Sequence, residues 1–201
     1  CNPNNPTGRS LTPDELGELH AAAPAALWVV DEAYADFTAA PWSAAGWAAQ
    51  GGWIVLRSMT KDFALGGLRV GYLIAEPELT ARLYAAQPPW NVNNLAQIGG
   101  MAACREIAWR ERTTGLVREH VDAMQTALRT AGYTPLPTVV NYFLLPVANG
   151  ALLRNALLTE RLIVRDCASF GLPEMIRIAM QLPEQNAQLT DALCRLAASA
   201  G

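Results

Sequence analysis

The 201-residue chain has a single lysine, Lys61, compared with 14 arginines. Arginine stays protonated in proteins and cannot act as a nucleophile, whereas a lysine amine can lose its proton and form a Schiff base. A lysine kept in a sequence that otherwise uses arginine is therefore a candidate for chemistry that arginine cannot perform. The alternative is a solvated surface lysine, and the residues around Lys61 decide between the two.

The sequence also lacks the features of several protein classes. Its net charge is −3 with 16% charged residues, and it has no polybasic stretch, so we expect neither nucleic acid nor a membrane as partner. The longest apolar run, residues 21–30, is interrupted by Pro24 and too short to span a bilayer, and there is no leader of the signal-peptide type. The four cysteines have neither metal-ligand spacing nor the density of a disulfide scaffold. We expect a cytoplasmic globular protein with reduced thiols and no metal.

Helix-like and strand-like segments alternate in the first half of the chain. Residues 11–23 begin with a capping threonine, a proline and two acidic residues, which is the pattern of a helix start. Short apolar runs at 27–30 and 53–56 predict buried strands of a mostly parallel sheet, and 69–75 is a third candidate strand. This alternation predicts an α/β layer architecture.

The second half predicts a small α+β domain. A long helix is expected from about residue 94 to 130, with breaks near Gly99-Gly100 and near residues 113–115. The elements expected after it are strands at 139–146, 162–165 and 175–180 and helices at 151–160 and 185–198.

Two clusters of polar residues lie in loops or directly after predicted strands, where open α/β sheets bind ligands. In Asn5-Pro-Thr-Gly8, prolines and a glycine fix a turn that holds the Asn5 amide, although an ordinary turn would look the same. Asp31 follows a predicted strand and Tyr34 comes three residues later. The carboxylate could face a protonated ring nitrogen and the tyrosine a ring hydroxyl, or Asp31 could simply cap a helix.

A third cluster surrounds the lysine and contains Ser58, Thr60, Lys61 and Arg69. Two hydroxyls and a guanidinium suit a phosphate group, and the glycines before Arg69 permit close approach of the backbone. Together the three clusters describe a ligand with a phosphate, a basic ring nitrogen, a phenolic oxygen and an aldehyde for the lysine. Pyridoxal phosphate has all four.

The motifs Asn-Pro-Thr-Gly, Asp-Glu-Ala-Tyr, Ser-x-Thr-Lys and Gly-Leu-Arg, in this order and spacing, resemble the fold type I pyridoxal-phosphate enzymes of the class I/II aminotransferase superfamily. The resemblance runs from residue 1 to about residue 198. It implies that residues 1–105 are part of a large cofactor-binding α/β domain with a mostly parallel sheet. Residues 106–201 would then form the small C-terminal α+β domain.

The resemblance also implies roles for the residues around the cofactor ring. Asn5 and Tyr34 would contact the phenolic oxygen of pyridoxal phosphate, and Asp31 would face its ring nitrogen. Lys61 would form the internal aldimine and would be the catalytic residue.

Two anionic groups would be bound by the remaining candidates. Ser58, Thr60 and Arg69 would hold the cofactor phosphate, with Thr60 where relatives usually have a serine. Arg177 resembles the arginine that binds the substrate α-carboxylate, for which a bidentate guanidinium is suited. Arg165 would help to bind a phosphate group on the substrate.

The subfamily is less sharply indicated. Residues 140–143 resemble the histidinol-phosphate aminotransferase branch, while segments 56–61, 89–93 and 165–172 look more like threonine-phosphate decarboxylases of cobalamin biosynthesis. The resemblance therefore implies decarboxylation of L-threonine O-3-phosphate to (R)-1-amino-2-propanol O-2-phosphate. Transamination of histidinol phosphate with 2-oxoglutarate is the alternative, because the outcome depends on how the substrate is oriented.

A third hypothesis is that the chain is a catalytically incompetent fragment of such an enzyme. The sequence opens inside the loop that contains Asn5, without an initiator methionine, and so reads as the C-terminal part of a longer protein. The N-terminal part of the large domain would then be absent, which would expose strand edges and apolar faces. For an intact chain the resemblance implies a homodimer.

Overall fold

Two compact units make up the chain in this computed structural model, which describes residues 1–200. Unit 1 consists of residues 1–4 and 10–114, and unit 2 consists of residues 5–9 and the chain from residue 115 onward. Each unit has a three-stranded sheet and its own hydrophobic core.

The division between the units falls inside a helix. The sequence suggested a domain boundary after residue 105, whereas the units divide after residue 114, within α5 (Ile107–Thr130). One continuous helix therefore contributes to both units. Domain boundaries more often fall in a flexible linker, which is the feature that composition can reveal.

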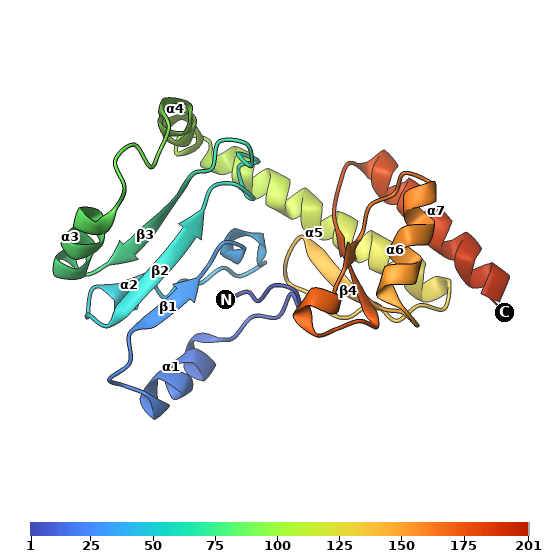
Figure 1. Cartoon of the computed structure of the whole chain (residues 1–201), viewed down its shortest axis with the longest axis horizontal. Coiled ribbons are helices and arrows are strands. Elements are labelled where there is room, and N and C mark those ends of the chain that lie inside the picture. Colours follow the sequence, from blue (N-terminus) through green and yellow to red (C-terminus); the bar gives the residue numbers. More distant parts are fainter. Residues whose placement is uncertain (201) are drawn as a thin grey trace. The chain divides into compact units, whose positions relative to one another are not determined.

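The sheet of unit 1 is mixed and has the order β1-β2-β3, with β1 (Trp28–Asp31), β2 (Trp53–Ser58) and β3 (Gly71–Ala75) (Figure 1). The three predicted strands are present, but only β1 and β2 are parallel, while β3 runs antiparallel to β2. The connections explain the difference. Residues 32–52 contain helical turns and allow a crossover, whereas the short connection 59–70 returns the chain in the opposite direction.

The first helix, α1 (Pro13–Ala22), begins where the sequence predicts it. The backbone N–H of Glu15 donates to the Thr12 hydroxyl (3.2 Å), and the N–H of Thr12 donates to the Glu15 carboxylate (2.7 Å). This reciprocal capping box satisfies backbone donors that the first helical turn leaves unpaired.

The long helix expected in the middle of the chain is two helices. The helical segments between α1 and α5 are η1 (Ala35–Phe37), α2 (Ala45–Ala48), α3 (Pro77–Ala86) and α4 (Asn94–Ala103). The break lies at residues 104–106, so the breaks predicted at Gly99-Gly100 and near residue 115 are wrong. A Cβ on Gly99 would come within 2.6 Å of the Leu68 side chain, so this glycine allows close helix packing and does not end the helix.

A cluster of aromatic side chains forms much of the core of unit 1. Trp53 is 5.5 Å from Trp28 and 5.1 Å from Trp47, measured between ring centroids. The buried members of this core are Leu16, Val30, Ala44, Ala48, Trp53 and Val55. This packing fixes β1 and β2 and thereby the positions of the residues that follow them.

A buried ion pair lies where β1 and β2 end. The Glu32 carboxylate is 2% exposed and accepts hydrogen bonds from the Arg57 guanidinium (3.0 Å), the Ser43 hydroxyl (2.6 Å) and the Ala44 N–H (2.7 Å). Arg57 also bonds to Asp36. These partners compensate the charge of Glu32, which would otherwise be costly to bury.

A second carboxyl group is buried without such compensation. Asp62 is 5% exposed, and its Oδ1 has no hydrogen-bond partner among residues 1–200. Burial, and next the nearby charge of Asp36, raise the pKa of Asp62 to about 6, while backbone hydrogen bonds of Asp62 and Phe63 and the charge of Arg110 oppose the shift. Arg110 itself pairs with Asp36 at 3.2 Å.

Unit 2 contains an antiparallel sheet of order β4-β6-β5. Its elements after α5 are β4 (Tyr142–Pro146), α6 (Gly150–Thr159), β5 (Arg165–Asp166), η2 (Ala168–Phe170), β6 (Met175–Ala179) and α7 (Pro183–Ala200). The helices predicted for this half and the strands predicted at 139–146 and 175–180 are present, whereas the strand predicted at 162–165 shares only Arg165 with β5, which is two residues long.

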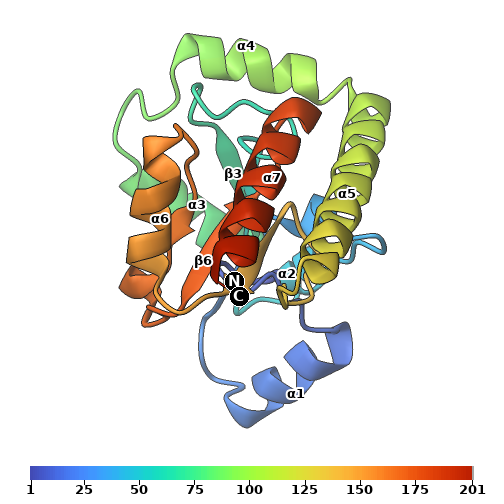
Figure 2. The same cartoon turned by 90° about the vertical axis from the view of Figure 1, so that its right-hand side faces the viewer.

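The core of unit 2 lies between its sheet and its helices (Figures 1 and 2). Phe143 and Ile178 are paired across β4 and β6 and face the helices together with Leu128 of α5, Leu157 of α6 and Leu193 of α7. None of the helices in the described 200 residues has the length and apolar character needed to cross a membrane.

The N-terminal segment 5–9 packs in unit 2. The Gly8 carbonyl accepts a hydrogen bond from the Val139 N–H (3.0 Å). Gly8 has φ +70°, and a Cβ at this position would lie 2.0 Å from Thr138 Oγ1. Both observations explain why glycine is needed here.

Replacing Gly8 should destabilise the fold. In Gly8→Ala the backbone stays in the left-handed region and the Cβ meets Thr138, so the free energy of unfolding should fall by about 2 kcal/mol or more. Urea unfolding followed by circular dichroism measures the change. Gly17→Ala in α1 is the matched control, because nothing lies within 4 Å of the added Cβ, and it should raise stability by up to about 1 kcal/mol. A Gly8→Ala protein as stable as the wild type would contradict this account.

The raised pKa of Asp62 should make stability depend on pH. The unfolded chain releases this proton near pH 3.8 and the folded chain near pH 6, so the carboxyl group destabilises the fold increasingly across that window. Asp62→Asn removes the titration. Its stability relative to the wild type should therefore rise from pH 4 to about pH 6 and level off above that. Denaturant unfolding at several pH values measures the difference, which would stay constant if the pKa of Asp62 were ordinary.

Candidate functional site

The carboxyl ends of β1 and β2 bring two of the predicted clusters together. Because these strands are parallel, they end at the same edge of the sheet, β1 at Asp31 and β2 at Ser58. Lys61 follows β2 in the next turn, and its Nζ lies 5.9 Å from the centre of the Tyr34 ring. This edge is where ligands bind in open α/β sheets.

A chain of hydrogen bonds links the hydroxyls to the lysine. The oxygens of Ser58 and Thr60 are 2.7 Å apart, and Lys61 Nζ donates to Thr60 Oγ1 at 2.9 Å. The backbone N–H of Thr60 donates to Ser58 Oγ at 3.2 Å. Thr60 is buried, whereas Lys61 is exposed, so the amine is anchored at the sheet edge and open to a ligand.

The two adjacent acids after β1 have different surroundings. The Glu32 carboxylate is buried and bonded within the fold. Asp31 is half-buried, and its Oδ1 accepts the N–H of Ala33 at 2.9 Å, which fixes the side chain in the turn. Its backbone carbonyl accepts the N–H of Asn2 at 2.8 Å. Asp31 is therefore the acid that can interact with a ligand at this edge.

Arg69 lies near the hydroxyl cluster but does not contact it. It comes two residues before Gly71, which is paired with Ser58 across β2 and β3. Its backbone has φ +59°, and its guanidinium donates to the Gly66 carbonyl at 3.0 Å. The side chain is exposed and belongs to the same end of the sheet as Ser58.

The other predicted residues meet in unit 2. The Arg177 guanidinium donates to the Asn5 side-chain oxygen and lies 5.0 Å from the centre of the Tyr142 ring. Its Nε is buried without a hydrogen-bond partner among residues 1–200. Arg165 on β5 is directly opposite Arg177 on β6, so both arginines belong to one face of the sheet.

The residues present fit pyridoxal phosphate by their chemistry. Ser58 and Thr60 offer paired hydroxyls for a phosphate, Lys61 offers a primary amine for an aldehyde, and Asp31 offers a carboxylate for a ring nitrogen. The unpaired Nε of Arg177 is a donor without an acceptor, which a carboxylate would supply.

The sequence analysis did not identify three charged residues that lie close to Ser58 at this edge of the sheet. Asp36, Asp62 and Arg110 line a pocket together with Ser58, on the same unit as Lys61. Nothing in their spacing indicates that Arg57 joins Glu32 to Asp36. The position of Asp62 directly after the lysine gave no signal of burial, because aspartate is common in solvated turns.

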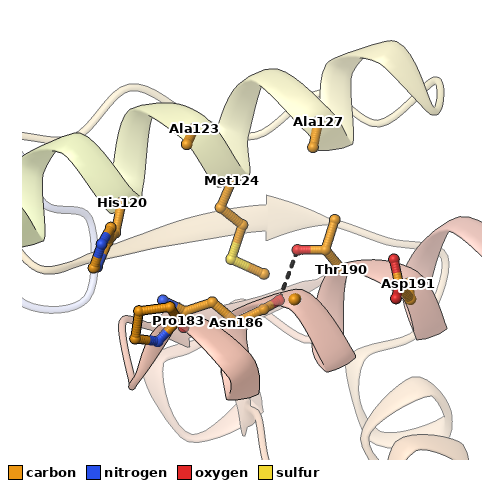
Figure 3. Close-up of a pocket in the computed structure, with 9 residues that line it drawn as sticks. His120, Ala123, Met124, Ala127, Pro183, Asn186, Thr190 and Asp191 are labelled. Atoms are coloured by element: carbon orange, nitrogen blue, oxygen red, sulfur yellow. Dashed lines mark hydrogen bonds between the residues drawn. The ribbon is translucent and has the colours of Figure 1, made fainter.

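Another pocket lies between α5 and α7 in unit 2 (Figure 3). His120 and Met124 project from α5, while Asn186, Thr190 and Asp191 come from α7. The Thr190 hydroxyl donates to the Asn186 backbone carbonyl at 2.8 Å, within the helix. The predicted site residues do not line this pocket, so it is not the candidate active site.

Comparison with known proteins identifies the family of the chain. Residues 1–193 match the sequence model of the family described as aminotransferase class I and II. A histidinol-phosphate aminotransferase from Symbiobacterium thermophilum is 36% identical over 196 residues, which cover 96% of this chain and 54% of that relative. The chain spans about half the length of the curated relatives it matches.

Solved structures show the same fold. Histidinol-phosphate aminotransferase from Clostridium acetobutylicum matches with a TM-score of 0.90 at 26% identity, covering 98% of this chain and 63% of that one. L-threonine-O-3-phosphate decarboxylase from Porphyromonas gingivalis matches with a TM-score of 0.84 at 29% identity, covering 96% of this chain and 62% of that one. The predicted fold type I architecture and the predicted cofactor are confirmed, and the chain belongs to the aminotransferase class I and II family of pyridoxal-phosphate-dependent enzymes.

Proposed function

We propose that this chain supplies the lysine-bearing part of an enzyme that acts on a small phosphorylated amino compound at the carbon bearing its amine. The observation that carries the proposal is the Lys61 amine, held 2.9 Å from the Thr60 hydroxyl at the carboxyl ends of parallel β1 and β2. An arginine could not supply this amine.

The residues of unit 1 would hold the cofactor at three points. Ser58, Thr60 and Arg69 would bind its phosphate, Asp31 its ring nitrogen, and Tyr34 its phenolic oxygen. The predicted contact of Asn5 with that phenolic oxygen is part of the same proposal. When bound, pyridoxal phosphate supplies an electron sink for the pair of electrons released at the substrate carbon.

Lys61 and Asp31 would then control two protons. Lys61 Nζ would bind the cofactor aldehyde in the resting enzyme and, once displaced by the substrate amine, would be placed to take a proton from the substrate carbon. Asp31 would keep a proton on the ring nitrogen, because a carboxylate next to a cation stabilises the charged form. The hydrogen bond from Nζ to Thr60 Oγ1 orients the amine for this task.

Arg177 would determine which bond at that carbon is cleaved. It would bind the substrate carboxylate and so fix how the substrate is turned. Arg165, directly opposite on β5, would bind a phosphate group on the same substrate. The two guanidinium groups have different partners in the fold, Ser169 for Arg165 and Asn5 for Arg177.

Two reactions are candidates. Transamination of histidinol phosphate is supported by the name of the Symbiobacterium thermophilum relative at 36% identity. Decarboxylation of L-threonine O-3-phosphate, as in cobalamin biosynthesis, is supported by the decarboxylase neighbour at 29% identity and by the opposed pair Arg165 and Arg177. For either reaction we propose that the intact enzyme is a homodimer.

Lys61 should be the site of covalent cofactor attachment. After addition of pyridoxal phosphate and reduction with borohydride, mass spectrometry should find one pyridoxyl group on the Lys61 peptide, together with a visible absorption band before reduction. Lys61→Arg keeps the charge but removes the amine, so the band and the label should disappear. Lys61→Arg also reports any labelling at an N-terminal amine. Equal labelling of both proteins would contradict the assignment.

A product assay should separate the two reactions. The 201-residue chain with pyridoxal phosphate should release CO2 from O-phospho-L-threonine if it is a decarboxylase. With histidinol phosphate and 2-oxoglutarate it should form glutamate if it is an aminotransferase. Arg177→Gln should lower kcat/KM by about 10- to 100-fold for O-phospho-L-threonine in the first reaction or for 2-oxoglutarate in the second, since a charged hydrogen bond to the carboxylate of that substrate is lost.

The control for the Arg177 variant is Arg82→Gln on the exposed surface of α3, which should leave kcat/KM unchanged. If neither product forms while the cofactor is attached at Lys61, both reactions are contradicted for this chain. That result is the one expected of a catalytically incompetent fragment.

A further inference from the structure

The turn that begins at Lys61 ends in a backbone conformation that needs support. The Ala64 N–H donates to the Lys61 carbonyl at 3.3 Å and closes the turn, and Ala64 has φ +54°. A non-glycine residue in this left-handed region costs free energy, and it persists where the surrounding structure holds it. The hydrogen bond inside the turn does not attach the turn to the rest of unit 1. We therefore looked for contacts that do.

Phe63, the third residue of the turn, packs against the start of α5. Its ring is stacked on that of Trp109, with an angle of 14° between the ring planes and 6.5 Å between the centroids. The Arg110 guanidinium lies over the same ring, 5.7 Å from its centre. A cation over an aromatic face is attracted by the charge distribution of the ring. Two consecutive residues of α5 thus hold the turn that carries the lysine.

Arg110 is itself held in place from two sides. Its backbone N–H donates to the Glu106 carbonyl at 3.1 Å, and its guanidinium pairs with the Asp36 carboxylate at 3.2 Å. The side chains of Arg110 and Asp36 are 22% and 16% exposed, so solvent and salt screen this pair less than a pair on the open surface. Asp36 is bonded in turn to Arg57 at the end of β2. The guanidinium over Phe63 is therefore part of a fixed network.

We propose that Arg110 is a positioning residue for the Lys61 amine. Asp36 fixes the guanidinium, the guanidinium and Trp109 fix the Phe63 ring, and the ring fixes the turn from which the lysine side chain projects. The amine then donates to Thr60 Oγ1 at 2.9 Å. Among residues 1–200, Arg110 has no hydrogen bond or ion pair with Thr60 or Lys61, so it acts through the turn. The consequence for the reaction rests on the proposed function, in which this amine reacts.

The route through the ring can be separated from a direct effect of charge. A planar guanidinium binds a carboxylate and stacks on an aromatic ring at the same time, and glutamine at position 110 loses both interactions. Phe63→Leu removes the ring and leaves every charge in place. If Arg110 acts through the ring, the two variants should have the same effect on the amine. An electrostatic effect of Arg110 on the lysine would appear in Arg110→Gln alone.

Nuclear magnetic resonance of the amine tests the proposal without any cofactor. Because Lys61 is the only lysine, methylation with carbon-13 formaldehyde and a borohydride places one labelled lysine amine in the chain. Lys61→Arg identifies its signal by the loss of that signal. The dimethylated amine keeps one N–H for Thr60. The transverse relaxation rate of the methyl signal then reports how freely the amine moves relative to the protein.

The relaxation rate should fall in Arg110→Gln and in Phe63→Leu, toward the rate in Thr60→Val, where the hydrogen-bond acceptor is removed. Arg112→Gln removes an equal charge from the exposed surface of the same helix and should leave the rate as in the wild type. Circular dichroism and urea unfolding show that each variant is folded. An unchanged rate in either Arg110→Gln or Phe63→Leu, or an equal fall in Arg112→Gln, would overturn the proposal.

Attachment of pyridoxal phosphate gives a second measurement. The visible band should appear about tenfold or more slowly in Arg110→Gln and Phe63→Leu than in the wild type, because a small displacement of a reacting group is costly. Equal rates in all three proteins would overturn the positioning role. Failure of the proposed function gives a different pattern, in which no band forms in any of them while the relaxation rate of the amine still depends on Arg110.

Discussion

The ion pair between Glu32 and Arg57 is the interaction on which the candidate site depends most. Glu32 follows Asp31 directly, and Arg57 directly precedes Ser58, so the pair joins the ends of β1 and β2 beside the residues expected to bind the cofactor. With Glu32 only 2% exposed, removal of Arg57 would leave a buried charge uncompensated, which typically costs about 3–5 kcal/mol, whereas removal of Glu32 would leave Arg57 paired with Asp36. Glu32, which supports the fold, and Asp31, which is proposed to face the cofactor ring, are thus neighbours in sequence.

Much of the fold could be predicted because its strands are short apolar runs and its first helix carries a full set of capping residues. The direction of β3 could not, since it depends on the length of a connection, 59–70, whose composition resembles that of any loop. The helix break was misplaced for a similar reason. Gly99 packs against Leu68 inside α4, and a glycine that allows close packing looks the same in sequence as one that ends a helix.

The part of the candidate site that consists of residues close together in the sequence could be predicted. Ser58, Thr60 and Lys61 lie within four residues and form one hydrogen-bonded group. Contacts between distant segments were not predictable, as with Asn5 and Arg177, which are 172 positions apart. The buried charge of Asp62 was missed because burial is a property of the folded surroundings and leaves little trace in composition.

The assignment of residues 5–9 to unit 2 has a consequence for how the two units are connected. The polypeptide passes between the units three times, after residues 4, 9 and 114. A single cleavage at residue 114 would therefore leave the units tied together by the N-terminal segment. A polypeptide that began at residue 115 would lack the Gly8 carbonyl that pairs with Val139 and the side chain that holds Arg177. The two units are therefore not separable modules, because Arg177 is hydrogen-bonded to a residue from the opposite end of the sequence.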